Sequence, residues 1–141
     1  MYKIFTLHPK ITEGKPGKLT EINITKLCKE YNIEFHTSKC FYVTELNSEE
    51  SRGNHSNTNA SELLVCLQGS YDITLHDGKD EVTLHLKQHD VVFIDKNVWI
   101  KYYNFKHCVI MAYVYIHPTD KDSCHDFNKF LLYNQNNEYN L

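Results

Sequence analysis

The sequence has 141 residues, of which 41% are hydrophobic and 23% are charged, and these shares are typical of a folded globular domain. The formal net charge is only −3 and no block of basic residues occurs, which argues against nucleic acid or an anionic membrane surface as a partner. No apolar run approaches the roughly 20 residues that a membrane-spanning helix needs. We therefore expect one domain that covers residues 1–141.

The five cysteines indicate a reducing compartment. Their number is odd and no CxxC pair occurs, which is typical of reduced and mostly buried thiols. We expect a cytoplasmic protein without structural disulfides.

Aromatic residues form 13% of the chain and favour β-structure. The strongest local signal is a hairpin, because residues 71–76 and 81–86 both alternate apolar and polar side chains on either side of Asp77-Gly78. Turn signals recur at the spacing of a sandwich or barrel. In chain order, the predicted strands are 1–6, 34–45, 63–67, 71–76, 81–86, 91–94, 98–103 and 108–116, and the predicted helices are 25–31 and 122–133, with 134–141 expected to fray.

One segment carries a histidine motif. His55 is followed by Asn57, Glu62 and Gly69, which fits the first motif of cupin barrels, G…H-x-H…E…G, with Asn57 in place of the second histidine. Because residues i and i+2 of a strand face the same side, we expect His55 and Asn57 to face the interior together. The resemblance implies an all-β fold, a double-stranded β-helix or jelly-roll barrel, to which the chain adds a short C-terminal helix.

The second cupin motif lacks its metal ligand. Its final asparagine is present as Asn104, but Ile100 stands where the metal-binding histidine would be. A metal cupin needs about three ligands of the His or Glu kind, and only His55 and Glu62 remain. We therefore do not expect a catalytic metal.

Longer stretches resemble a narrower family, the WxcM-like cupins that act as nucleotide-sugar 3,4-ketoisomerases. Its pattern contains R-G-x-H, L-V-C-x-x-G-S, an aspartate-glycine turn and V-W, which correspond to residues 52–55, 64–70, 77–78 and 98–99. The resemblance covers about residues 15–131.

The resemblance implies an activity, a partner and a set of site residues. The activity moves the keto group of dTDP-4-keto-6-deoxyglucose from C4 to C3, without a cofactor, on the route to 3-amino-3,6-dideoxy sugars for surface polysaccharide. The partner would be a second copy, in a homodimer that exchanges N-terminal strands. The implied catalytic residues are His55 and Tyr42, and the substrate-binding residues are Arg52, Asn57, Glu62, Trp99 and Lys39.

Two departures from the family pattern leave alternatives open. Asn57 and Ile100 stand where the family has histidines. The second hypothesis is therefore a related nucleotide-sugar-binding or epimerase cupin without ketoisomerase activity, and the third is a metal-dependent cupin enzyme.

The chemistry of the isomerisation suits His55. The C3 proton must leave, an enediol must form, and a proton must arrive at C4. An imidazole, with an ordinary pKa near 6.5, accepts and donates protons at neutral pH, and one base on one face of the ring could do both. Tyr42 or Asn57 would stabilise the oxygen that gains negative charge, and the Arg52 guanidinium matches the geometry of a pyrophosphate.

Overall fold

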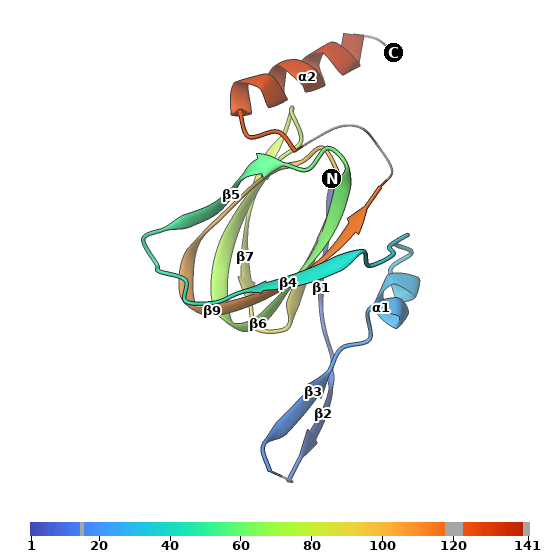
Figure 1. The fold of residues 1–141 in the computed structure, drawn as a ribbon, viewed down its shortest axis with the longest axis vertical. Coiled ribbons are helices and arrows are strands. Elements are labelled where there is room, and N and C mark those ends of the chain that lie inside the picture. Colours follow the sequence, from blue (N-terminus) through green and yellow to red (C-terminus); the bar gives the residue numbers. More distant parts are fainter. Residues whose placement is uncertain (15, 118–122, 140–141) are drawn as a thin grey trace.

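The computed structural model describes residues 1–14, 16–117 and 123–139 and contains a β-barrel with two short helices (Figure 1). The elements are β1 (Tyr2–Thr6), β2 (Lys10–Glu13), β3 (Lys18–Glu21), α1 (Ile24–Glu30), β4 (Lys39–Val43), β5 (Ser51–Ser56), β6 (Ala60–His76), β7 (Glu81–Lys87), β8 (Asp90–Ile94), β9 (Trp99–Ile116) and α2 (Phe127–Tyr139).

Two long antiparallel strands, β6 and β9, organise the barrel. They pair from Ala60 opposite Ile116 to His76 opposite Trp99. The first half of β6 also pairs with β8 and its second half with β7, while β9 pairs first with β5 and then with β4. β1 completes one edge on β8. The long strands thus join seven strands into one sheet that closes into a barrel (Figure 1), and the predicted jelly-roll barrel is confirmed.

Register shifts in the middle of β6 keep both halves of the strand facing the core. Leu64 and Cys66 belong to the interior cluster, and so do Tyr71 and Ile73, so the inward positions change from even to odd numbers. Gly69 lies at this shift with a φ of 71°, and a Cβ there would lie 2.1 Å from the carbonyl oxygen of Lys106. The glycine of the cupin motif is therefore required by the bulge.

A second apolar cluster lies outside the barrel, under α1. Leu63, Val65 and Val91 face outward and pack with Leu27 and Cys28 of α1. Residues 63–67 are apolar throughout because this part of β6 is buried on both faces.

Several predicted boundaries are wrong. The strands predicted at 63–67 and 71–76 are one strand, β6, and those predicted at 98–103 and 108–116 are both parts of β9, because bulges bend these strands without ending the pairing. Only Lys39–Val43 of the predicted strand 34–45 is in the sheet.

The elements nearest the two ends of the chain also differ from the prediction. The hairpin of β2 and β3 had no predicted counterpart. The C-terminal helix begins at Phe127 instead of Asp122, which lies outside the described residues, and it includes residues 134–139, which we expected to fray. In the described part of the chain, neither helix is long and apolar enough to cross a membrane.

Candidate active site

A bulge in β5 turns Arg52 and His55 to the same side. Residues three apart would face opposite sides of a regular strand, but the register shifts between Gly53 and His55, and Asn54 is the extra residue. Arg52 consequently lies opposite Tyr102, and His55 lies opposite Ile100, both of which belong to the interior cluster. The R-G-x-H motif therefore directs a guanidinium and an imidazole toward the barrel interior.

Glycine is required at this bulge. Gly53 has a φ of 87°, and a Cβ at this position would lie 2.7 Å from the carbonyl oxygen of Ile100. Any larger residue would push β5 away from β9 and move the His55 ring with it.

A buried carboxyl group lies next to the motif. Glu62, at the start of β6, is 8% exposed, and its Oε1 accepts a hydrogen bond of 2.9 Å from Nδ2 of Asn57, which is 9% exposed. Burial raises the pKa of Glu62, and the nearby charge of His55, the Asn57 hydrogen bond and the charge of Lys39 oppose that rise in decreasing order. The amide of Asn57 thus orients Glu62.

Strand register explains why the charge of Lys39 opposes the rise in the pKa of Glu62. On β9, Val114 lies opposite both Lys39 of β4 and Glu62 of β6. Directly opposed residues share a face of the sheet, so all three side chains are on the interior face. His55, Asn57, Glu62 and Lys39 are therefore grouped at the end of the barrel where β5 ends and β6 begins, the upper end in Figure 1.

Arg52 has a protein partner. It hydrogen-bonds to the hydroxyl of Tyr102, which is 7% exposed. Burial raises the pKa of Tyr102, and Arg52 opposes that rise. The guanidinium is itself exposed, so it is held at the rim with donors free to face solvent.

The segment before α2 adds a second imidazole to this group. The rings of His55 and His125 have centroids 5.5 Å apart and planes inclined by 30°. The segment is fixed by a β-bridge, in which the backbone N–H of Ser56 donates to Cys124 (2.8 Å) and that of Cys124 donates to Ser56 (2.9 Å). Ser123 Oγ also donates to Oδ1 of Asn57 over 3.3 Å.

Tyr42 lies away from this group. It is opposite Met111, on the face of β4 that points out of the barrel, and its side chain is 67% exposed. Its neighbour Phe41 is opposite Ala112 and shares the interior face with Lys39. The catalytic role implied for Tyr42 stays a prediction, and the placement does not support it.

Trp99 is also directed elsewhere. It follows the alternation of β9 and faces out, opposite to Ile100, where its ring packs on Phe127 at 5.1 Å and on Phe130 at 5.7 Å between centroids. The structure gives Trp99 the role of a support for α2, and its predicted contact with substrate is not supported by this placement.

Sequence reasoning missed His125, Tyr102 and Ser123. No spacing in the sequence marks them, because they reach the site through pairing with distant segments. Within the described ranges, no group of three or more His, Cys, Asp or Glu side chains is arranged to hold a metal ion. All five cysteines are free thiols.

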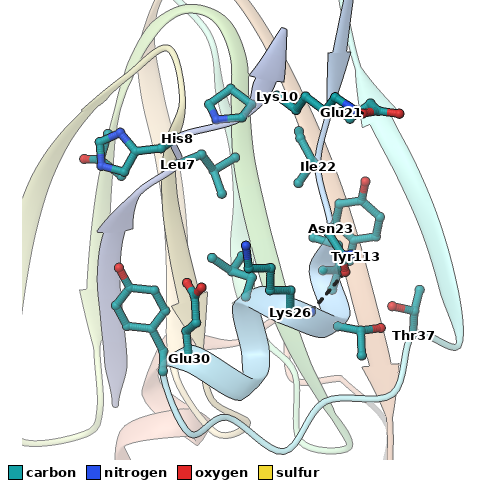
Figure 2. Close-up of a pocket in the computed structure, with 16 residues that line it drawn as sticks. Leu7, His8, Lys10, Glu21, Ile22, Asn23, Lys26, Glu30, Thr37 and Tyr113 are labelled. Atoms are coloured by element: carbon teal, nitrogen blue, oxygen red, sulfur yellow. Dashed lines mark hydrogen bonds and ion pairs between the residues drawn. The ribbon is translucent and has the colours of Figure 1, made fainter.

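A wide pocket of about 960 Å³ lies apart from this group, between α1 and the base of the β2–β3 hairpin (Figure 2). Leu7, Ile22 and Leu27 contribute apolar walls, and Lys10 and Lys26 contribute charge. None of the residues predicted for catalysis or substrate binding lines it.

Two known proteins with related sequences are named as 3,4-isomerases of TDP-linked sugars. A TDP-4-oxo-6-deoxy-α-D-glucose 3,4-oxoisomerase of Aneurinibacillus thermoaerophilus is 29% identical over 127 residues, which cover 88% of this chain and 86% of that protein. The X-ray structure of a TDP-fucose 3,4-ketoisomerase of Campylobacter jejuni is 26% identical, with a TM-score of 0.75 and coverage of 96% of both chains.

A third comparison concerns the fold alone. A sugar 3,4-ketoisomerase of Thermoanaerobacterium thermosaccharolyticum, solved in complex with TDP, has a TM-score of 0.75 at 22% identity and covers 96% of each chain.

The family comparison agrees with these relatives and covers nearly the whole chain. The model of the FdtA family, described as WxcM-like, C-terminal, matches residues 2–135. The resemblance inferred from the R-G-x-H and L-V-C-x-x-G-S motifs is confirmed, and the chain belongs to the FdtA, WxcM-like C-terminal family.

Proposed function

We propose that the protein is a TDP-sugar 3,4-ketoisomerase that converts dTDP-4-keto-6-deoxyglucose to the 3-keto isomer. The observation that carries this proposal is the position of His55. Its imidazole lies beside the buried carboxyl of Glu62 at one end of the barrel, in a chain that matches this family over residues 2–135. The two relatives more than 25% identical are both named as 3,4-isomerases of TDP-linked sugars.

His55 is the base that removes the C3 proton. The carboxylate of Glu62 attracts the positive charge that the half-buried His55 ring acquires when it accepts this proton. Asn57 keeps Glu62 in place through the 2.9 Å hydrogen bond. A histidine at position 57 would remove the amide that holds Glu62. We therefore assign Asn57 the task of orienting Glu62 and not that of carrying a proton.

Arg52 and Lys39 bind the diphosphate of the substrate. Both side chains are exposed and both extend from the interior face of the barrel at the end that holds His55. A guanidinium held by Tyr102 matches the bidentate geometry of phosphate oxygens, whereas the ammonium acts as a point charge.

The protein works as a homodimer that exchanges N-terminal strands. β1 is an edge strand whose single ladder runs along β8, so a partner's β1 replaces it without disturbing the rest of the sheet. The β2–β3 hairpin projects from the barrel in Figure 1, and all eight of its residues are exposed.

The product serves a cytoplasmic route to 3-amino-3,6-dideoxy sugars. A 3-keto group is the substrate that an aminotransferase needs, and such sugars are used in surface polysaccharide. The free thiols of all five cysteines are compatible with a cytoplasmic location.

The test is conversion of dTDP-4-keto-6-deoxyglucose by the purified protein, coupled to a sugar 3-aminotransferase. We expect a 3-amino product to accumulate only when the protein is present. Asn57→His should lower the rate, because it removes the donor that orients Glu62. No product with the wild-type protein, at enzyme concentrations that suffice for the Campylobacter relative, would refute the proposal.

A further inference from the structure

The group around His55 contains a second imidazole that the motif does not specify. His125 comes from the segment between β9 and α2, and its ring lies 5.5 Å from that of His55 between centroids. Position 57, where the histidine motif has its second imidazole, is an asparagine whose amide is already bonded to Glu62 and Ser123. The described structure therefore offers two imidazoles in contact, from two different segments.

The segment that carries His125 is anchored on both sides. Before His125, the backbone of Cys124 forms two hydrogen bonds with Ser56, the residue next to His55. After it, Asp126 Oδ1 accepts from the N–H of Lys129 and so caps α2, while Phe127 and Phe130 pack on Trp99. These contacts hold the His125 backbone against the end of β5, whereas its side chain remains exposed to an incoming ligand.

We infer that His125 is a second proton-transfer residue, which protonates C4 after His55 has removed the proton from C3. This inference rests on the proposed ketoisomerase function. Two rings with centroids 5.5 Å apart and planes inclined by 30° are close enough to serve adjacent carbons of one bound sugar. A histidine donates as readily as it accepts near neutral pH, so the pair divides the two carbon steps.

The two steps balance without a further reactant. In the first, the C3–H bond breaks and its proton goes to His55, its electron pair forms the C3–C4 double bond, and the π pair of the C4 carbonyl moves to O4, which takes a proton from water. In the second, the π pair of the C3–C4 double bond takes the proton of His125 to form the C4–H bond, the O3–H bond breaks, and its electron pair forms the C3 carbonyl while the proton leaves to water. Proton exchange through water between the adjacent rings restores His55 to its neutral form and His125 to its protonated form.

The experiment separates the two steps in D₂O. Wild type and His125→Asn are incubated with dTDP-4-keto-6-deoxyglucose, and NMR follows loss of the C3 proton from unreacted substrate and formation of the 3-keto product. His125→Asn should form product at least about 100 times more slowly, the usual contribution of a positioned proton donor. It should still exchange the C3 proton at a rate near that of wild type, because His55 is intact.

Two controls make the result specific. Lys129→Ala changes an exposed side chain in the first turn of α2, close to His125, and should leave both rates unchanged. Free imidazole should restore part of the product formation of His125→Ala but none of that of His55→Asn.

The outcomes separate the two claims. Equal loss of exchange and product formation in His125→Asn indicates a structural role and overturns this inference, and so does an unchanged rate of product formation. A wild-type protein that neither exchanges the C3 proton nor forms product overturns the proposed function instead.

Discussion

At the scale of single residues, Glu62 is the group whose environment the fold changes most clearly within the site. It is almost fully buried beside one amide donor, and burial outweighs the favourable charges of His55 and Lys39, so its pKa rises. Such a carboxyl, next to a candidate base, is typical of an active site. The raised pKa of Glu62 also makes a measurable contribution to the pH dependence of the free energy of unfolding.

We predict that Glu62→Gln changes this pH dependence with a defined sign. A raised folded-state pKa means that the native state binds a proton more tightly than the unfolded chain. The free energy of unfolding of the wild type should therefore rise, relative to Glu62→Gln, as the pH falls through the folded pKa toward the ordinary value of 4.5. Urea denaturation of both proteins between about pH 8 and pH 5 measures the difference. If the difference in free energy of unfolding between the two proteins stays constant or shrinks as the pH falls, the folded state does not disfavour the charged form of Glu62.

At the scale of elements, the bulge of β5 decides what the R-G-x-H motif can do. Regular alternation would place Arg52 and His55 on opposite faces, and the extra residue at Asn54 places them on one. The bulge depends on Gly53, both for its positive φ and for its close approach to Ile100.

We predict that Gly53→Ala is more harmful than Gly14→Ala. Both glycines have a positive φ, but nothing lies within 4 Å of a Cβ at Gly14, whereas a Cβ at Gly53 would overlap the Ile100 carbonyl. The free energy of unfolding should fall by roughly 1–3 kcal/mol more for Gly53→Ala than for the control, as overpacking does. Chemical denaturation checks this, and equal losses in the two variants would mean that the bulge tolerates a side chain.

The elements also show which features the sequence could predict. The hairpin after Tyr71 and the barrel fold follow from alternation, a turn and a motif of defined spacing, which are local signals. The face of Trp99, the outward direction of Tyr42 and the approach of His125 depend on register between distant strands and on a bridge to Ser56. Such long-range pairing leaves no trace in the local sequence pattern. The sequence therefore predicted those members of the site that belong to the motif, such as His55 and Glu62, and missed those that distant segments bring in.

At the scale of the whole molecule, the N-terminal hairpin exposes an aliphatic side chain on each of its two faces. Ile11 lies opposite Thr20 and Leu19 opposite Thr12, so the two aliphatic side chains are on opposite faces of the hairpin, 42% and 59% exposed. Packing one face on the chain's own barrel would leave the other in water. An isolated two-stranded hairpin is only marginally stable.

We predict a dimer that depends on these two side chains. Light scattering coupled to gel filtration should give twice the chain mass of 16.6 kDa for the wild type. The double variant Ile11→Lys with Leu19→Lys should shift toward the monomer, while Ile11→Val with Leu19→Met, which keeps both faces apolar, should remain dimeric. A wild type that is monomeric at the concentrations used for assay would contradict the exchanged dimer.

The central claim is that the imidazole of His55 is the base that removes the C3 proton of a TDP-linked keto sugar. The most direct measurement is the rate of 3-keto product formation by His55→Asn compared with wild type, with unfolding temperature in the presence of dTDP as the check on folding and binding. We predict a loss of at least about 100-fold in rate with dTDP stabilisation retained. Turnover by His55→Asn at the wild-type rate would contradict the account.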